Sequence, residues 1–288
     1  MTGITKAPKR IFTLGPEGTF SDKATRRLLE HLRRQHPASA PEILYTRTIP
    51  EVLSRTQADG ESLGVLPIEN SDAGTVVPAQ DALGRHQVVI IYELSLQVRF
   101  CLLAQGPLAQ VKKLFAQPVA LEQCNQYVSR NLPGAETSLT HSNTESGHLY
   151  LEARAQGHVA AIVPPEFAAE HLSERVAEDI QNYRDNTTRF VVIAPRQGTG
   201  APDFSRHKTS LLVDPGEDRP GLLYDILSVF KRHGVNLTRL ESRPARTRAW
   251  TYLFFLDVDN NPHVERVLGE LSAQGVGITV LGCYDRLE

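Results

Sequence analysis

Three short polar clusters in the 288-residue chain contain residue types that bind carboxylates. They are Gly18-Thr19-Phe20-Ser21, Glu69-Asn70-Ser71 and Asn186-Thr187-Thr188-Arg189. Each cluster stands at a predicted element end, and ligands of open α/β sheets collect beyond the carboxyl ends of strands. Helix N-termini bind anions through backbone N–H groups and short hydroxyls, and Arg189 could add a bidentate clamp. The clusters predict a carboxylate site, although their spacing alone also fits helix caps, a turn and a surface ion pair.

Motifs for metal, nucleotide or nucleophilic chemistry are absent from the sequence. The ten histidines lack metal-ligand spacing, and no Ser/His/Asp set stands out. Neither the dinucleotide-binding glycine pattern nor the P-loop pattern occurs, so we expect no cofactor and no metal. The three cysteines, Cys101, Cys124 and Cys283, are far apart, which fits a reducing cytoplasm. The basic stretch is interpreted as a solvated loop; it comprises Arg239, Arg243, Arg246 and Arg248.

Composition and charge are those of an ordinary globular protein. Apolar residues make up 41% and charged residues 22% of the chain, and the net charge is −2. Cutting the chain at Lys208 leaves 21 basic against 22 acidic residues before the cut and 10 against 11 after it. Neither part is a polycation, so we expect no nucleic-acid or membrane-surface partner. No apolar run approaches about 18 residues, and the N-terminus lacks an apolar signal core, so we expect a cytoplasmic protein.

Strands and helices are predicted to alternate through most of the chain. Thr19 and Ser21 can cap a helix in which Ala24, Leu28 and Leu32 form an apolar stripe. We expect strands at 11–14, 63–68, 88–92, 94–104, 136–140, 159–163 and 188–194. We expect helices from about 20 to 36, from 50 to 59, and at 76–83, 107–115, 119–131, 144–155 and 166–172.

The C-terminal part is predicted to fold as a unit of its own. The stretch 197–202 is rich in Gly and Pro, which indicates a linker. Beyond it, the pattern predicts strands at 208–213, 235–242, 249–258 and 276–284 and helices at 220–233 and 262–274. The order βαββαβ is typical of a ferredoxin-like α+β fold.

Four motifs in order along the chain resemble those of the prephenate dehydratase family. The stretch 14–21 (LGPEGTFS) resembles its opening signature and the stretch 67–71 (PIENS) its second, with Gly74, Val76 and Asp81 behind it. Thr188-Arg189-Phe190 resembles the motif with the family's essential threonine. The stretch 241–244 (ESRP) resembles a signature of its C-terminal ACT regulatory domain.

The resemblance implies an architecture. The catalytic domain, 8–198, would have a periplasmic-binding-protein-like α/β fold with two lobes, 8–84 with 183–198 and 85–182. A linker, 199–206, would lead to the ACT domain, 207–288. Family members couple ACT domains between subunits, so a homodimer or homotetramer is expected. Only about ten residues precede the first predicted strand, so we expect no fused chorismate mutase domain.

The resemblance also implies a reaction. Prephenate would lose its ring hydroxyl and ring carboxylate together, giving phenylpyruvate, CO2 and water. Aromatisation drives this step, so neither a metal nor a redox cofactor is required. Thr188 would bond the leaving oxygen, and Glu69 is a candidate for proton transfer. The residues implied for substrate binding are Thr19, Ser21, Asn70, Ser71, Gln123, Ser142, Arg189 and Phe190.

The ACT resemblance implies feedback inhibition by L-phenylalanine. The stretch 220–223 (PGLL) resembles the loop that borders the phenylalanine site in this family, which usually has Ala where Leu222 stands. The residues implied for phenylalanine binding are Gly221, Leu222, Leu223, Asn236, Leu237, Glu241 and Ser242.

Two departures from the family pattern keep alternatives open. The family's Ser-His-Pro-Gln stretch is Ala116-Gln117-Pro118-Val119 here, and its Ser-Thr-Ala segment is Ser142-Asn143-Thr144. These changes motivate a lower activity or a non-catalytic amino-acid sensor. A further alternative is a preference for arogenate, the amino-acid analogue of prephenate, which a carboxylate in the pocket would favour.

Overall fold

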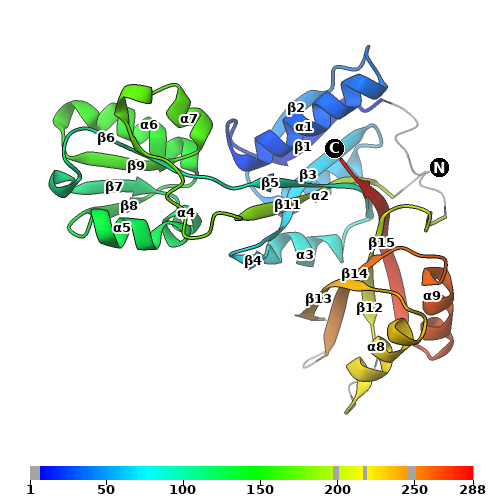
Figure 1. The fold of residues 1–288 in the computed structure, drawn as a ribbon. Helices are drawn as coiled ribbons and strands as arrows, with labels where there is room; N and C mark the ends of the chain where they lie inside the picture. Colours follow the sequence, from blue (N-terminus) through cyan, green and yellow to red (C-terminus); the bar gives the residue numbers. More distant parts are fainter. Residues whose placement is uncertain (1–6, 197–200, 217–218, 246–250, 288) are drawn as a thin grey trace.

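The computed structural model describes residues 7–196, 201–216, 219–245 and 251–287. Figure 1 shows a central lobe flanked by a second lobe and by a C-terminal domain. The described strands form two sheets, one of ten strands that runs through the central lobe and the C-terminal domain, and one of five strands in the second lobe. No helix among the described residues combines the length and apolar character of a membrane span.

The first, central lobe is a mixed sheet with helices on both faces. Its strands are β1 (Arg10–Leu14), β2 (Glu42–Thr46), β3 (Ser62–Asn70), β4 (Gly74–Thr75), β5 (Val88–Gln97) and β11 (Thr187–Pro195). Its helices are α1 (Phe20–Gln35), α2 (Ile49–Ala58) and α3 (Val77–Leu83). The apolar stripe of α1 packs on one face with Ile11 and Val65, whereas α2 and α3 bury Leu53 and Leu83 on the other. Strand β11 lies between β3 and β5 and runs antiparallel to both.

The second lobe is a five-stranded sheet in the order β10-β6-β9-β7-β8. The strands are β6 (Cys101–Ala104), β7 (Lys113–Ala116), β8 (Glu136–Leu139), β9 (Val159–Val163) and β10 (Arg175–Ala177). The helices are α4 (Pro118–Gln123), α5 (Asn125–Asn131), α6 (Asn143–Ala153) and α7 (Pro165–Ala169), with 3-10 turns at Leu108–Gln110, Arg154–Gln156 and Leu172–Glu174.

The C-terminal domain confirms the predicted βαββαβ order. It consists of β12 (Lys208–Asp214), α8 (Leu222–Arg232), β13 (Leu237–Pro244), β14 (Tyr252–Asp259), α9 (Val264–Ala273) and β15 (Gly277–Arg286). Both helices cover one face of its sheet (Figure 1), where Phe230 of α8 and Leu271 of α9 are fully buried.

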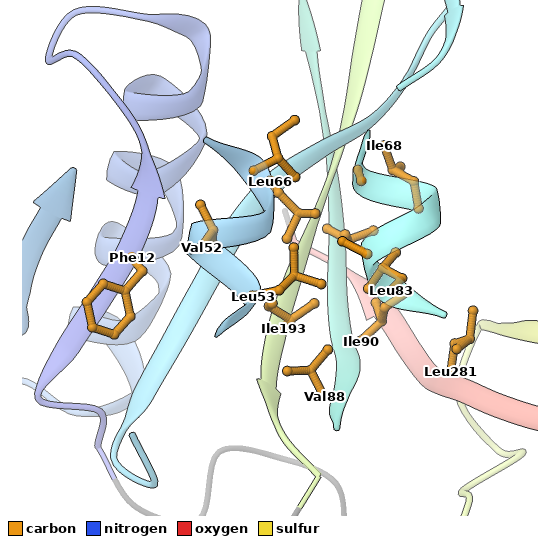
Figure 2. Packing of buried hydrophobic residues seen from close by; sticks show 14 of the residues in the cluster. Phe12, Val52, Leu53, Leu66, Ile68, Leu83, Val88, Ile90, Ile193 and Leu281 are labelled. Atoms are coloured by element: carbon orange, nitrogen blue, oxygen red, sulfur yellow. The ribbon is translucent and has the colours of Figure 1, made fainter. Parts of the chain in front are cut away.

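The C-terminal domain continues the sheet of the first lobe. Strand β15 pairs in parallel with β5, so that Asp285 lies opposite Tyr92. The two strands approach so closely at Gly282 that a Cβ there would lie 2.2 Å from the carbonyl oxygen of Ile90. Leu281 also belongs to the apolar cluster that Ile90 and Leu83 form, part of which Figure 2 shows. The two domains therefore share both a sheet and a core.

The two-lobed α/β architecture implied by the resemblance is confirmed, but the position of the first crossing is not. The expected crossing near residue 85 is wrong, because β5 stays in the first sheet and the chain leaves it only after Gln97. The run 88–94 is buried on both faces, because α1 covers one face of the sheet and α2 and α3 cover the other. The return segment ends where β11 begins, at Thr187.

Some predicted elements also differ. The helix expected at 107–115 is a short turn followed by β7, and the helix at 119–131 is interrupted at Cys124. Strands β2, β4 and β10 were not predicted. Residues 197–200, which include the end of the predicted first lobe and the start of the linker, lie outside the described residues, as do Arg246 and Arg248. The described part of that basic stretch is not solvated, because Arg243 bonds Asp81.

Candidate functional site

A cavity of about 610 Å³ lies between the two lobes. The first lobe contributes the end of β3, the start of α1 and the stretch from β4 to α3. The second lobe contributes the starts of α4 and α6, and Thr188 of β11 completes the lining. Of the predicted catalytic and substrate-binding residues, six line this cavity: Thr19, Ser21, Asn70, Gln123, Ser142 and Thr188.

Thr188 and Asn70 form the polar centre of the cavity. They are register partners on β11 and β3, and the Asn70 Nδ2 donates to the Thr188 Oγ1 at 2.9 Å. The Asn70 Oδ1 accepts from the backbone N–H groups of Asp72 (3.0 Å) and Ala73 (2.7 Å), which can only donate, so the orientation of the amide is fixed. The Thr188 oxygen therefore receives a hydrogen bond, and its own O–H is left to donate toward a ligand.

Asn70 also connects the two lobes. Its Oδ1 accepts from the Gln123 Nε2 of α4 at 3.1 Å, and its Nδ2 donates to the Asn186 Oδ1 at 2.8 Å. All three side chains are at least 92% buried. Asn186 was not in the predicted set, although it stands in the polar cluster before Thr188. This buried network holds the catalytic candidates in one arrangement, although the Asn186 Nδ2 has no hydrogen-bond partner among the described residues.

Helix N-termini supply the cavity with backbone donors. The N-cap residues of α1, α3, α4 and α6 all line it, and α1 and α6 are the long helices among them. The Thr19 hydroxyl caps α1 by accepting from Asp22 N, and the Ser142 hydroxyl caps α6 by accepting from Glu145 N at 3.1 Å. The free N–H groups and the positive dipole ends of α1 and α6 suit a bound carboxylate.

The cavity has almost no charged side chain. Among the described residues, no lysine or arginine lines it, and Glu122 and His141 are its titratable members. Asn143 lines it as well, and its Oδ1 accepts no hydrogen bond from the described residues. The described residues also hold no cluster of three or more His, Cys, Asp or Glu side chains suited to a metal ion.

An apolar wall completes the cavity. Phe20 and Phe100 come from different lobes and pack edge to face, with ring centroids 5.9 Å apart. Val98 and Val119 lie in the same lining. This wall suits a six-membered carbon ring. Sequence reasoning assigned none of these four residues to the substrate site, because an apolar side chain that lines a cavity cannot be told from a core residue in the sequence.

Four predicted site residues lie outside the cavity lining. Phe190 is 1% exposed and belongs to the core of the first lobe. Ser71 exchanges two hydrogen bonds with the backbone of Thr187 at 2.9 Å, so it fixes the chain just before Thr188. Glu69 and Arg189 pair with each other at 3.3 Å, on the side of the sheet that the C-terminal domain covers.

Burial and hydrogen bonding act in opposite directions on the carboxylate of Asp22, in the first turn of α1. Burial alone would raise its pKa, but hydrogen bonds from Tyr45, from Arg26 and from the N–H of Gly18 hold the pKa below its ordinary value. Asp22 thus stays ionised and fixes the loop that precedes α1.

A second, smaller cavity of about 150 Å³ lies in the C-terminal domain. Leu222 and Ser242, both in the predicted phenylalanine set, line it together with Phe254 and Tyr252. The other five predicted residues do not line it. Glu241 instead accepts a hydrogen bond from Thr75 at 3.0 Å, and Asn236 donates to Asp259. Gly221 has a φ of 81°, and Leu223 and Leu237 pack against the domain core.

Comparison with known proteins shows to which family this chain belongs. A model of the family "Prephenate dehydratase" matches residues 11–198, and a model of the "ACT domain" matches residues 212–276. The prephenate dehydratase of Methanocaldococcus jannaschii is 34% identical over 95% of this chain and 97% of its own. This chain belongs to the prephenate dehydratase family.

Solved structures of prephenate dehydratases share the whole fold. That of Staphylococcus aureus matches with a TM-score of 0.76 at 26% identity, covering 96% of this chain and 99% of its own. That of Arthrobacter aurescens, in complex with L-Phe, matches with a TM-score of 0.77 at 32% identity, covering 96% and 90%. Both departures from the family pattern lie at helix starts in the cavity, where Gln117 and Ser142 each cap a helix.

Proposed function

We propose that this prephenate dehydratase converts prephenate to phenylpyruvate, CO2 and water at the cavity between its lobes. The observation that supports the proposal most is the Asn70–Thr188 pair at the centre of a cavity with an aromatic wall. The ring of prephenate packs against Phe20 and Phe100. Its leaving hydroxyl then faces Thr188.

Thr188 donates its hydroxyl proton in a hydrogen bond to the leaving oxygen. Because Asn70 donates to the same Oγ1, the threonine O–H is polarised as negative charge develops on the leaving group. The C–O bond breaks, the ring carboxylate leaves as CO2, and its bonding electrons restore the aromatic ring. The leaving hydroxide becomes water by taking one proton, which solvent supplies through the Thr188 hydroxyl. Aromatisation supplies the driving force.

The two carboxylates of prephenate are bound by neutral donors. The N-termini of α1 and α6 offer backbone N–H groups from opposite lobes, with the hydroxyls of Ser21 and Ser142 beside them. Gln123 holds Asn70 across the lobes. Closing the lobes around the ligand excludes water and strengthens these hydrogen bonds.

Replacing the catalytic threonine tests the proposal. Thr188→Ala should lower kcat for phenylpyruvate formation by roughly 10²–10⁴-fold and leave the melting temperature nearly unchanged. Thr187→Ala is the matched control, because the Thr187 hydroxyl bonds the backbone of Asp185 and lies outside the cavity lining. Unchanged turnover in a folded Thr188→Ala protein contradicts the catalytic role.

Phenylalanine is the proposed inhibitor and the C-terminal cavity its site. The ACT family match, the lining by Leu222 and Ser242 and the L-Phe complex of the Arthrobacter aurescens relative support this. We expect Ser242→Phe to fill the cavity and abolish both calorimetric L-Phe binding and the inhibition of turnover. If L-Phe neither binds the unmodified protein nor changes its turnover, the regulatory proposal fails.

We also propose that the protein is a cytoplasmic homo-oligomer. A homodimer or homotetramer coupled through ACT domains would appear in sedimentation as a species of at least twice the chain mass of 31.9 kDa. All three cysteines are buried and unpaired, which fits the reducing cytoplasm.

A preference for arogenate is the second candidate substrate specificity. Glu122 favours it, because this carboxylate lines the cavity and would pair with the ammonium group that prephenate lacks. In competition assays, Glu122→Gln should then lower kcat/KM for arogenate and leave that for prephenate unchanged or higher. An unchanged ratio of the two values contradicts this candidate.

A further inference from the structure

The residue after the catalytic threonine connects the active site to the ACT domain of the same chain. Thr188 pairs with Asn70, and the next register pair on the same two strands is Arg189 with Glu69. Neighbouring residues of a strand point to opposite faces of the sheet. Thr188 lines the cavity, whereas Arg189 contacts the ACT domain behind it.

All three nitrogens of the Arg189 guanidinium are bonded. Nε donates to Glu93 at 2.8 Å, Nη1 to Asp257 of β14 at 2.7 Å, and Nη2 to the Tyr284 hydroxyl of β15 at 2.9 Å. The Arg189 side chain is 13% exposed, and those of Glu93 and Asp257 are 4% and 3% exposed. Burial alone would lower the pKa of Arg189, but the charges of Asp257 and Glu93 raise it, so the guanidinium stays cationic.

The backbone around Arg189 depends on this side chain for its position. The register between β11 and β3 shifts directly after Arg189, where Phe190 lies opposite Pro67. Proline has no N–H to donate, so the ladder on this side is weakened next to the catalytic residue. A planar guanidinium held at three points restrains the strand where that ladder is weak.

Resting on the proposed function, we infer that Arg189 is a positioning residue through which Asp257 and Tyr284 of the ACT domain set the placement of Thr188. A motion of β14 or β15 relative to the first lobe displaces Arg189, and the adjoining peptide carries the displacement to the Thr188 hydroxyl. A misplacement of about 1 Å can cost about 10²-fold in rate. Arg189 does not bind substrate, because it lies outside the cavity lining.

The test uses the full chain, with substitutions of Arg189 and of its two partners in the ACT domain. Asp257→Asn and Arg189→Lys should each lower kcat for prephenate about tenfold or more, with KM within about twofold, since ground-state binding does not involve Arg189. Tyr284→Phe removes a hydroxyl that bonds both Arg189 and Ser210 but leaves the charges in place, so it should give a smaller fall in kcat. It also covers the case in which Asp257→Asn fails to fold.

The matched control is Arg196→Lys. Arg196 also bridges the first lobe and β15, by donating to the backbone oxygens of Val88 (3.2 Å) and Val280 (2.9 Å), but it stands at the other end of β11 from Thr188. Arg196→Lys should lower the melting temperature and leave kcat unchanged. A purely structural role of Arg189 would make both arginine variants alike.

Two results overturn the inference. The first is an unchanged kcat in folded Arg189→Lys. An unchanged kcat in both of the single variants Tyr284→Phe and Asp257→Asn has the same meaning. The second is a loss confined to KM, which would place Arg189 in substrate binding. The proposed function fails separately, if the unmodified protein does not produce phenylpyruvate from prephenate.

Discussion

The two faces of the strand pair β3 and β11 differ in charge. On the cavity side, β3 and β11 present Asn70 and Thr188 among neutral donors, without a lysine or arginine in the described lining. On the side of the ACT domain, the same strands present Glu69 and Arg189 in a buried ionic network. The anionic substrate is thus expected where the cationic side chains are not.

This difference indicates why charged side chains lie at the domain junction and neutral donors in the cavity. Buried ion pairs are directional and costly to separate, so they suit a permanent junction between domains. Neutral N–H and O–H donors bind a carboxylate more weakly and can be arranged to strengthen as the transition state forms. The following substitutions break or sharpen the comparison, beginning with the largest expected effect.

A carboxylate placed in the cavity should be the most damaging change. Asn70→Asp repels the dianion and removes the donor to Thr188, so kcat/KM should fall about 10³-fold or more, combining charge repulsion with an unpaired buried group. Steady-state assays of phenylpyruvate formation measure it. Asn182→Asp is the control, because Asn182 lies outside the lining and its Oδ1 accepts from Gln126 N, as a carboxylate also would. Equal activity of the two variants would contradict the need for the neutral amide of Asn70.

Removing a charge from the junction should also lower stability. Glu93 pairs with Arg189, Lys208 and Arg286. Glu93→Gln removes the carboxylate that pairs with the buried Lys208 ammonium and one of those that pair with Arg189, and it should lower the free energy of unfolding by about 3 kcal/mol or more. Urea unfolding measures this change. The exposed pair of Glu166 with Lys23 is the control, and Glu166→Gln should stay within about 1 kcal/mol of the unmodified protein.

Two helix caps separate stability from binding. The hydroxyls of Thr19 and Thr48 each accept from a backbone N–H in the first turn of their helix at 3.3 Å. Thr19→Ala and Thr48→Ala should each lower the free energy of unfolding by about 1 kcal/mol. Only Thr19 lines the cavity, so only its variant should raise KM for prephenate. An equal change in KM for both variants would show that the start of α1 has no special role in binding.

Acid pH should reveal the smallest effect. Despite burial, hydrogen bonds lower the pKa of Asp22 below its ordinary 3.8. A carboxylate with a lowered folded pKa stabilises fully above its unfolded pKa, and this stability is lost as pH falls through the folded value. In Asp22→Asn, stability should therefore depend less on pH below about pH 4. Urea midpoints at pH 3 and pH 6 test this, and parallel losses in both proteins would contradict it.

The sequence predicted the polar centre of the site better than its surroundings. Thr188, Asn70 and Gln123 converge as the motifs implied, and the Thr19 cap follows from local chemistry alone. Motif adjacency was misleading for Glu69 and Arg189, because adjacent strand residues face opposite sides. The alternation of a strand would have separated them. Which partner covers the second face cannot be read from a strand itself.

The remaining errors in the fold have a similar cause. The stretch 114–116 is a short apolar run, which fits a strand or a helix until its neighbours are known, and pairing with β8 and β9 makes it a strand. Strand β5 is an interior strand of the sheet because it pairs with β15, which lies nearly two hundred residues later in the chain. Local pattern carries no information on that pairing.

The place of β15 in the sheet has a consequence for biosynthesis. Strand β15 is the last strand of the ten-stranded sheet to be synthesised, yet it lies inside the sheet, between β12 and β5. While the ribosome is still making the ACT domain, the nascent first lobe has β5 as an open apolar edge. Open edges pair readily with other chains. The interval before β15 emerges is therefore when the nascent protein most needs a chaperone, and slowing translation there should increase misassembly.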